Sequence, residues 1–353
     1  MRKVQKFIVR GKEVFVGLED SKRTWKLCVR CQGIVVHEVS MPAEYDNLRS
    51  YFEGRYPECE IQLMYEAGFR GFWLHDLLEQ DGIGCVVTPA SKVTQEKVNL
   101  VKTDKVDARR LAKNLENGDY SSCHVPDREL REDRQISRTL NQIQRVIVAT
   151  KNRIRKFLDF HNLNEGLPAG KWRESHYKTV RSCKLSPPLQ ICLDTSFELL
   201  DKLDELRSRL QGELKSLCEK ERYRESVEIK DSFPGVGWLS AIRFTLEWGD
   251  MSRFGGGEQI ACFAGLTSRE YSTGETIHRG RITKQGNGQV RCWLIECAWR
   301  AIRQDQVLLN KFLRIWGNTG SKKKAIVAVA RKMAVRMRAL ELARQPYQCG
   351  VIK

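Results

Sequence analysis

The chain has 353 residues, with 61 Lys and Arg against 44 Asp and Glu, and its formal net charge is +17. This length allows two or three domains, and this charge favours a polyanionic partner, DNA or RNA ahead of a membrane surface. No apolar run approaches the ~20 residues that span a bilayer, and no signal-type hydrophobic segment follows Met1. We therefore expect a soluble, cytoplasmic protein without a membrane partner.

The first region, residues 1–125, predicts an α/β domain. Short apolar runs typical of buried strands stand at 14–18, 25–29, 33–36, 61–65 and 85–87. A tight turn at Gln32-Gly33 would make the first three strands an antiparallel meander. Helices are expected at 72–80 and after Thr103, whose hydroxyl can cap one. Strands followed by alternating strands and helices indicate a mixed sheet covered by helices.

The middle region, residues 126–228, predicts helices. Apolar residues recur at three- and four-residue steps from about 127 to 162, and leucines follow Pro187 at near-heptad spacing. A stretch containing Gly and Pro at 166–170 separates the two runs. Both runs are charged on their other faces. We expect a coiled-coil-like spacer or oligomerisation arm, and hence a homo-oligomer.

The last region, residues 229–353, predicts a mainly α domain. The Pro-Gly-Val-Gly turn at 234–237 leads into a helix expected at 239–248. It is similar to the hairpin of helix-hairpin-helix modules, whose turn amides approach a phosphate, and an ordinary helix-start turn is the alternative. A polar loop is expected at 267–289, followed by two closing helices at 290–303 and 324–344.

Basic residues gather toward the C-terminus, where Glu341 is the one acidic residue beyond Asn310. The last predicted helix carries a basic stripe on an otherwise apolar helix, made of Arg331, Lys332, Arg336 and Arg338. Such a stripe indicates either contacts to phosphates or a solvated helix face.

Cysteines are numerous, twelve in all, but they are scattered singly. Cys28 and Cys31 form a C-x-x-C pair, and no second pair stands at zinc-ligand spacing. Most of the others lie in apolar runs, which is typical of reduced core thiols rather than of metal ligands.

Four carboxylates carry most of the chemical information: Glu19, Glu66, Asp104 and Asp107. The two Glu residues each end an apolar strand, and the two Asp residues share a helix face at i, i+3. Two Mg²⁺ ions about 4 Å apart need several converging oxygen ligands. Each acid taken alone could be a solvated surface group. Together, in so basic a chain, they predict a Mg²⁺-dependent enzyme that acts on nucleic acid.

A series of motifs in fixed order carries a resemblance to a known family. In the N-terminal half they are FVGLEDSK at 15–22, YEAG at 65–68 and KTDKVDAR at 102–109. In the C-terminal half they are PGVG at 234–237, AGLT at 264–267, YSTG at 271–274 and RGRITKQGN at 279–287. This order resembles the DEDD-motif insertion-sequence transposases of the IS110 family over nearly the whole chain. The middle region resembles the family in being helical but shares no sequence motif with it.

The resemblance implies a recombinase that excises and inserts a mobile DNA element. It implies a RuvC-like (RNase H-like) N-terminal domain in which Glu19, Glu66, Asp104 and Asp107 bind Mg²⁺. A hydroxyl of the C-terminal domain would attack the scissile phosphate and form a covalent protein–DNA link. The family is also associated with a structured guide RNA that selects the DNA sites.

The chain departs from the family pattern at two positions. The first ligand is Glu19 where Asp is usual, and its extra methylene moves the carboxylate by about 1 Å. Asp20 is adjacent, but on a strand its side chain would point to the opposite face. At the nucleophile, gapless alignment places Thr273 at the usual serine, and Ser272 stands one residue earlier. Either hydroxyl can do the chemistry, although threonine is the more hindered.

Two rival functions remain open on the sequence. A structure-selective nuclease of the Holliday-junction type would use the carboxylates to activate water and would need neither Ser272 nor Thr273. A catalytically inactive nucleic-acid-binding descendant would explain the two departures. A covalent protein–DNA adduct would argue against the first, and an intact DNA element with matching ends around the gene would argue against the second.

Overall fold

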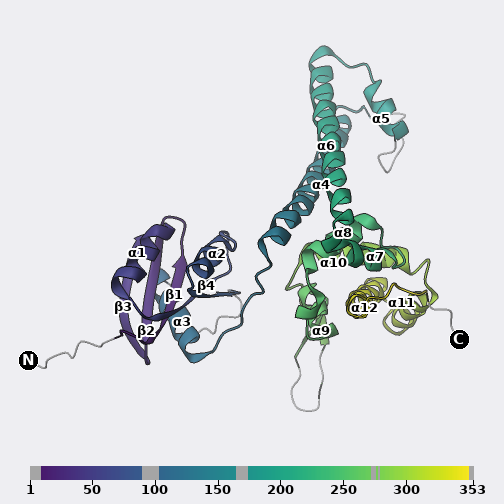
Figure 1. Cartoon of the computed structure of the whole chain (residues 1–353). Coiled ribbons are helices and arrows are strands. Elements are labelled where there is room, and N and C mark those ends of the chain that lie inside the picture. The colour runs from purple at the N-terminus through teal and green to yellow at the C-terminus, as the bar shows by residue number, and fades with distance from the viewer. Residues whose placement is uncertain (1–8, 90–102, 164–173, 272–275, 277–278, 350–353) are drawn as a thin grey trace, which may run out of the picture. The chain divides into compact units, whose positions relative to one another are not determined.

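The computed structural model describes residues 9–89, 103–163, 174–271, 276 and 279–349. Its internal contacts divide the chain into two compact units, residues 1–125 and 126–353 (Figure 1). Each unit is described by itself. The boundaries predicted from sequence are 125 and 228, and the second of these falls inside the larger unit. No helix within the described ranges is long and apolar enough to cross a membrane.

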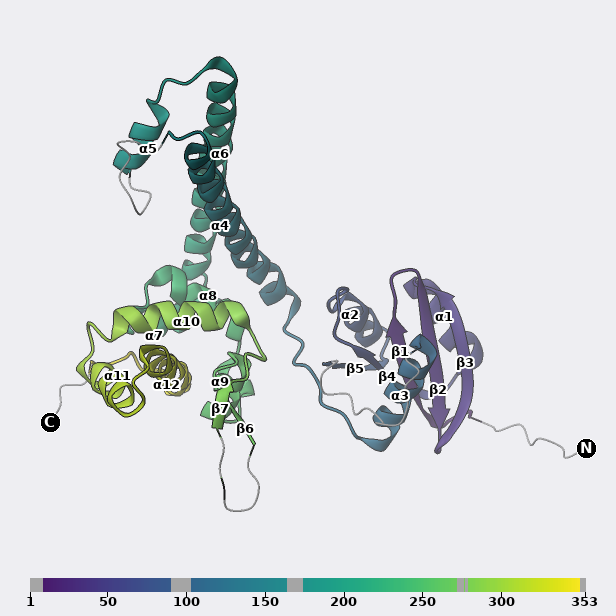
Figure 2. The same cartoon turned by 180° about the vertical axis from the view of Figure 1, so that it is seen from behind.

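The first unit is built on a five-stranded mixed sheet with the order β3-β2-β1-β4-β5 (Figure 2). Its strands are β1 (Glu13–Asp20), β2 (Thr24–Cys31), β3 (Ile34–Pro42), β4 (Glu60–Glu66) and β5 (Gly84–Thr88). The β1–β2 and β2–β3 pairs are antiparallel, whereas β1–β4 and β4–β5 are parallel. Gln32 and Gly33 both have positive φ, as a two-residue hairpin turn requires. The predicted strands and the predicted mixed sheet are confirmed.

Helices cover both faces of this sheet. On one face, the even-numbered residues of β1 pack with α1 (Tyr45–Arg55) and α2 (Trp73–Gln80). On the other face lies α3 (Asp104–Asn117), whose Leu111 and Leu115 pack on Met64 of β4. Helix α1 was not predicted from the sequence. Only Leu48 and Phe52 are buried in it, so its apolar period is too weak to indicate a helix.

Helix α3 touches the backbone of β1 directly at Gly17. A Cβ at this position would lie 2.1 Å from the carbonyl oxygen of Ala108 and 2.3 Å from the amide of Ala112. No real side chain tolerates such distances. The absence of a side chain at position 17 therefore sets how closely α3 lies against the central strand.

The two cysteines of the C-x-x-C pair lie on opposite faces of β2. Cys28 packs against Ala108 and Ala112 of α3, whereas Cys31 belongs to the core under α1 and α2. Burial raises the pKa of the Cys28 thiol to about 11. Both observations fit thiols that serve packing, and two thiols on opposite faces cannot ligate one ion.

The second unit begins with a helical arm of α4 (Arg128–Phe160), α5 (Glu174–Arg181) and α6 (Pro187–Glu219). Asp127 caps α4 by accepting a 2.9 Å hydrogen bond from the amide of Leu130, and Pro187 opens α6. Helices α4 and α6 lie side by side in Figures 1 and 2. Their shared core contains Ile147, Ile154, Leu158, Leu193, Phe197 and Leu200. The two predicted helical runs are confirmed.

The rest of this unit is mainly helical. It contains α7 (Glu221–Asp231), α8 (Trp238–Trp248), the 3₁₀ turn η2 (Met251–Arg253), α9 (Gly257–Phe263), β6 (Ser268–Glu270), β7 (Arg279–Ile282), α10 (Gly288–Ala301), α11 (Gln306–Thr319) and α12 (Lys322–Leu342). One core runs from the base of the arm, at Leu130 and Leu214, through α8 and α10 to Met337 of α12. The arm base and the C-terminal helices therefore stabilise one another.

Two expectations for this region are wrong. The stretch 267–289 is not only a polar loop, because β6 and β7 pair within it as a short antiparallel sheet. These strands have three and four residues, so no alternating pattern shows them. The chain also closes with three helices rather than two, since α11 precedes α12. Asp305 caps α11 by accepting from the amide of Leu308, and Leu308 and Phe312 bury one of its faces.

The Pro-Gly-Val-Gly turn leads into α8, as the sequence predicted, and it joins this helix to α7. Gly235 has φ +75°, and a Cβ there would lie 2.6 Å from the carbonyl oxygen of Cys297 in α10. The glycine is thus explained by close packing on α10. A phosphate contact by this turn, as in helix-hairpin-helix modules, stays a prediction.

Candidate active site

The first two carboxylates lie at one edge of the sheet because their strands are parallel neighbours. Leu18 of β1 pairs with Tyr65 of β4, so Glu19 and Glu66 follow at the same level. Side chains alternate along a strand, and each Glu stands two residues beyond a position that faces α3, Gly17 or Met64. Both carboxylates therefore lie on the face of the sheet that α3 covers.

The other two carboxylates reach this edge from the first turn of α3. Thr103 caps the helix by accepting a 3.4 Å hydrogen bond from the amide of Val106. Asp104 and Asp107 follow in the first turn, where the helix dipole favours negative charge. Since Ala108 lies over Gly17, the start of α3 lies over Glu19. The structure thus brings all four predicted acids to one edge.

The pKa of Glu19 is shifted by its burial and by the neighbouring acids. Burial raises the pKa of Glu19; the Ser21 hydroxyl, which donates a 2.8 Å hydrogen bond to Oε2, opposes that shift. The negative charges of Asp104, Asp20 and Asp107 raise the Glu19 pKa further. The carboxylates of β1 and of the first turn of α3 are thus close enough to raise the pKa of Glu19.

Arg110 of α3 lies between two of the acids. Its Nη2 is 3.2 Å from Oε1 of Glu66 and 2.8 Å from Oδ1 of Asp107. The contact with Glu66 is an aligned hydrogen bond, whereas Oδ1 of Asp107 is buried and receives no aligned N–H despite its short ion pair. Oδ1 of Asp107 is therefore a buried acceptor that a differently placed cation could use.

The donor set suits a hard divalent cation, because all four predicted ligands are carboxylates on a strand end or a helix start. Within the described ranges, however, no three or more His, Cys, Asp or Glu side chains converge closely enough to hold a metal ion. The four residues fit a divalent cation in their donor atoms and in their places on the fold, but not in the orientation of their side chains. Side-chain rotations at Glu66, Asp107 and Arg110 would have to complete it.

Asp20 lies on the other face of β1, as the sequence predicted. Its Oδ1 accepts a 2.8 Å hydrogen bond from Nε1 of Trp25 and forms a 2.7 Å ion pair with Arg70. Burial raises its pKa, which these two contacts oppose. Asp20 therefore stabilises the sheet and is not one of the acids at the α3 edge.

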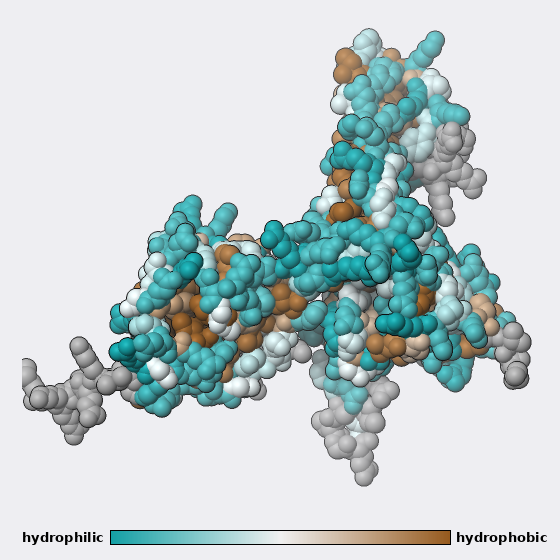
Figure 3. Space-filling model, viewed as in Figure 1, coloured by the Kyte–Doolittle hydropathy of each residue, from teal (hydrophilic) through white to brown (hydrophobic). Residues whose placement is uncertain are grey.

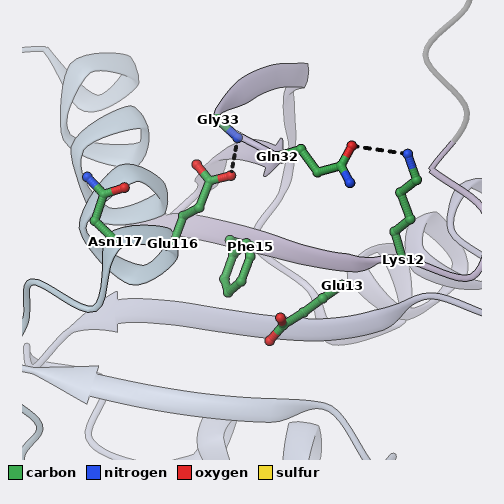
Figure 4. Close-up of a pocket in the computed structure, with 7 residues that line it drawn as sticks. All are labelled: Lys12, Glu13, Phe15, Gln32, Gly33, Glu116 and Asn117. Atoms are coloured by element: carbon green, nitrogen blue, oxygen red, sulfur yellow. Dashed lines mark hydrogen bonds between the residues drawn. The ribbon is translucent and has the colours of Figure 1, made fainter.

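A cavity of about 490 Å³ lies at the opposite end of α3 (Figure 4). There Glu116 accepts a 2.6 Å hydrogen bond from the amide of Gly33 and pairs with Arg30, and Lys12 donates to Gln32. Glu116 is three helical turns from Asp104 and serves to tie α3 to the β2–β3 turn. This cavity is separate from the four acids.

The two predicted nucleophiles, Ser272 and Thr273, lie outside the described residues. The strands on either side of them are described, and β6 and β7 pair through Ser268–Ile282 and Glu270–Arg279. Thr283 N donates a 2.8 Å hydrogen bond to Thr267 O and continues this pairing. The segment that carries both hydroxyls therefore begins and ends at a paired hairpin base.

The buried acid Glu247 joins the region of the β6–β7 hairpin to helix α4 of the arm. Glu247 of α8 is 1% exposed, and Arg138 of α4 donates to both of its carboxylate oxygens at 2.9 and 3.0 Å. Asn287 donates a 2.8 Å hydrogen bond to Glu247 and caps α10 by accepting from Gln289 N and Val290 N. The backbone amide of Asn287 also donates to the carbonyl of Phe263. These contacts fix the chain directly after β7.

Sequence reasoning missed Arg110 and Glu247. Arg110 stands among several basic residues, so nothing in the sequence distinguishes it from them. Glu247 lies inside an apolar helix, Trp238–Trp248, and an acid within such a helix is a signal of a buried polar network.

Comparison with known proteins gives two matching family models. Residues 16–163 match a DEDD transposase model of the IS110 type, and residues 228–313 match the model described as the transposase IS116/IS110/IS902 family. Together they cover the four acids, helix α4 and the hairpin region.

Several relatives with curated names are similar to the chain. A candidate transposase of Sinorhizobium fredii, y4qE, is 30% identical over 68% of this chain and 58% of its own length. A second one from the same organism, y4rJ, is 28% identical over 91% of this chain and 90% of its own length. The transposase for insertion sequence element IS1533 of Leptospira borgpetersenii is 26% identical over 68% of this chain and 70% of its own length. The alignment with the first relative thus spans under two thirds of that protein, whereas the second aligns almost end to end.

Proposed function

This chain belongs to the IS116/IS110/IS902 family of transposases, enzymes that cleave DNA and transfer its strands, and we propose that it moves an insertion-sequence element with a Mg²⁺-dependent carboxylate site and a Ser or Thr nucleophile. One observation carries the proposal. Glu19, Glu66, Asp104 and Asp107 share one edge of the sheet, although they come from three separate places in the sequence.

The first unit is proposed to be RuvC-like. Support comes from its sheet order and from the pairing of β1, which is antiparallel to β2 and parallel to β4. In such a sheet the ends of β1 and β4 point the same way, so acids at these ends form one site. The first turn of α3 adds two more acids to that site.

Glu19, Glu66, Asp104 and Asp107 would hold the metal in this proposal. A bound divalent cation supplies positive charge where negative charge develops on the scissile phosphate. The protein's own residues position these ligands: α3 and the two strands orient the four carboxylates, and Arg110, which pairs with both Glu66 and Asp107, offsets the repulsion between these two.

The nucleophile is proposed to be Thr273 or Ser272. Its hydroxyl oxygen would lose its proton and form a bond to phosphorus while one phosphorus–oxygen bond of the DNA breaks. The released DNA end would leave as a hydroxyl, taking up a proton, and the reverse reaction would rejoin a strand. Support from the described residues is limited to the flanks of this segment, where β6 pairs with β7 and Asn287 is anchored to Glu247.

The carboxylate proposal is tested by conservative variants of the acids. Asp104→Asn, Asp107→Asn and Glu66→Gln should each lower DNA cleavage in Mg²⁺ by at least about a hundredfold while nucleic-acid binding survives, because each removes a charged metal ligand. Asp119→Asn is the matched control, since Asp119 is an exposed acid just past the end of α3. Near-parental cleavage by any of the three variants would refute that residue's assignment.

The nucleophile proposal is tested by trapping the covalent adduct on denaturing gels. One of Thr273→Ala and Ser272→Ala should eliminate the adduct, and Thr273→Ser should be at least as active as the parent because a primary hydroxyl is less hindered. Cleavage without any adduct would instead favour the water-activating nuclease of the Holliday-junction type. Binding without cleavage would favour the inactive descendant.

Two partners besides DNA belong to the proposal. A structured guide RNA is supported by the resemblance to the family and by the net charge of +17, which suits polyanions. Homo-oligomerisation is supported by the arm, on whose surface Figure 3 shows hydrophobic residues. Ile191 and Leu199 of α6 are 67% and 45% exposed, and Val146 and Val148 of α4 are also exposed. Such side chains on a long helical pair suit contacts with a second copy.

A further inference from the structure

A basic pocket lies between the last two helices of the chain. Its volume is about 310 Å³, and α11 and α12 line it with Val307, Leu308, Asn310, Lys311, Arg314, Lys332 and Arg336. Four of the five polar side chains are cationic, and the fifth is an amide. Two of the cations come from α11 and two from α12, so the cluster exists only because the two helices pack together.

The basic stripe of α12 is divided by the structure into two pairs with different roles. Arg331 forms an ion pair with Glu258 of α9, and Arg338 donates to the carbonyl of Phe254. These two arginines tie α12 to the preceding elements. Lys332 and Arg336 instead face α11 across the pocket. Two residues of the predicted basic stripe, Arg331 and Arg338, therefore make structural contacts. The other two, Lys332 and Arg336, line the pocket with Lys311 and Arg314 of α11, which were not predicted to take part.

No acid within the described ranges forms an ion pair with a cation of the pocket. Among the residues that the structure describes, Lys311, Arg314 and Lys332 form no ion pair, and nor does Arg336. Glu341, the one acid beyond Asn310, is engaged with Lys230 and Ser226. Burial lowers the pKa of Lys311, and the charges of Lys332, Arg314, Arg331 and Arg336 lower it further. Positive charge is thus concentrated here without a counter-charge, as in an anion site.

One cation of the pocket is held in place. Arg336 donates a 2.9 Å hydrogen bond to the hydroxyl of Tyr347, which donates a 2.6 Å hydrogen bond to Oδ2 of Asp305. Oδ1 of the same Asp305 caps α11. The ring of Tyr347 packs on Phe233 at 4.3 Å between centroids. The guanidinium therefore loses little side-chain entropy when it binds a ligand.

We propose that the α11–α12 pocket binds the phosphodiester backbone of a nucleic acid, with Lys311, Arg314, Lys332 and Arg336 contacting adjacent phosphates. Four cations from two helices line one cavity of about 310 Å³, and consecutive phosphates of a strand offer several negative charges to such a set. Asn310 adds a neutral donor and acceptor for a sugar or phosphate oxygen. The choice of polymer rests on the proposed function. The pocket itself is distinct from the carboxylates.

The test is the salt dependence of binding, measured in EDTA so that metal binding does not contribute. Lys311→Gln/Lys332→Gln should weaken binding roughly tenfold to a hundredfold near 0.1 M salt and reduce the slope of log K against log[salt] by about two. Lys311→Arg/Lys332→Arg should restore both. The matched control is Lys323→Gln/Lys324→Gln, which removes the same charge from exposed positions at the start of α12. Thermal melting of each variant checks that α11 and α12 remain packed.

Parallel titrations with a DNA duplex and with an RNA hairpin identify which polymer the pocket takes. A loss of affinity and slope for either polymer, or for both, supports the proposal if the control pair changes neither. An unchanged slope for both polymers, or an equal loss in the control pair, would overturn it. Cleavage by the acid-site variants is a separate readout, so failure of the pocket proposal and failure of the carboxylate proposal can be told apart.

Discussion

Arg110 is the residue that most affects how the acid site can work. Its guanidinium contacts Glu66 and Asp107 together, and these are two of the acids proposed to hold the metal. A cation on the protein and a cation from solution therefore compete for the same two carboxylates. Without a metal ion the arginine keeps the two acids close together, but its positive charge also lowers their affinity for a metal ion.

Replacing this arginine should strengthen metal binding while it weakens the metal-free fold. For Arg110→Gln we expect a roughly tenfold higher affinity for Mn²⁺ in calorimetric titrations, because one positive charge leaves the site. The melting temperature without metal should fall, since Glu66 and Asp107 would repel each other unopposed.

Arg109→Gln is the control for this experiment, since Arg109 pairs with Glu38 instead. Weaker or unchanged Mn²⁺ affinity in Arg110→Gln would mean that the guanidinium supports the site rather than competing for it.

The four acids could be predicted from the sequence, whereas Arg110 could not. Glu19 and Glu66 end recognisable strands, and Asp104 and Asp107 follow a capping Thr, so each acid has a local signature. The position of Arg110 between Glu66 and Asp107 depends on how far α3 advances over the sheet. That distance is fixed by contacts such as Ala108 over Gly17, which no local pattern shows.

At the scale of elements, a buried ion pair joins α7 to α12. Lys230 is fully buried, and its Nζ donates to Oε2 of Glu341 at 2.5 Å and to the Ser226 hydroxyl at 2.6 Å. Burial lowers the pKa of Lys230, and the carboxylate of Glu341 opposes this shift. Such a pair is costly to desolvate, so breaking it from one side leaves an uncompensated charge.

Lys230→Met should therefore lower the free energy of unfolding by about 3–5 kcal/mol in urea titrations. The double variant Lys230→Met/Glu341→Leu should recover much of that loss, because no buried charge remains. The exposed pair Lys202–Glu205 of α6 provides the control, where Lys202→Met should cost less than about 1 kcal/mol. Equal losses in the single and double variants would show that the pair itself supplies little and that packing is what matters.

Elements with a strong period could be predicted, and those fixed by tertiary contacts could not. Strands β1 to β5 alternate or are continuously apolar, and α4 and α6 show long helical periods. Strands β6 and β7 are short, and the hydrogen bonds of Thr267 and Asn287 beside them are tertiary contacts that no local pattern shows. Helix α11 buries Leu308 and Phe312 on one face, but it was not among the predicted helices.

At the scale of the whole chain, each unit has a core of its own. The core of the first unit lies within residues 1–125, between the sheet and α1 and α2, and α3 covers the opposite face. The larger unit is held by the core that links the arm base to α12. Cooperative folding within each unit is the expected consequence.

A fragment of residues 1–125 should accordingly fold by itself. We expect a mixed α/β circular dichroism spectrum, a cooperative melt, and stabilisation by Mg²⁺ or Mn²⁺ that Asp107→Asn removes. A fragment ending at residue 88 should fail to fold, because it lacks α3 and exposes Met64. A disordered 1–125 fragment would show that this unit needs the rest of the chain.

The close contact between α3 and Gly17 makes positions 17 and 19 differ in their tolerance of mutation. Because Ala108 and Ala112 already touch the β1 backbone, α3 has no room to move toward the strand. A change in the length of the side chain at position 19 must then be accommodated by that side chain's own rotamers. Exchange of Glu and Asp there alters the reach of one carboxylate and leaves the other three in place. A single methyl group at position 17 would displace the helix that carries Asp104 and Asp107. Gly17, which has no chemical role of its own, should therefore tolerate substitution less well than the proposed metal ligand Glu19.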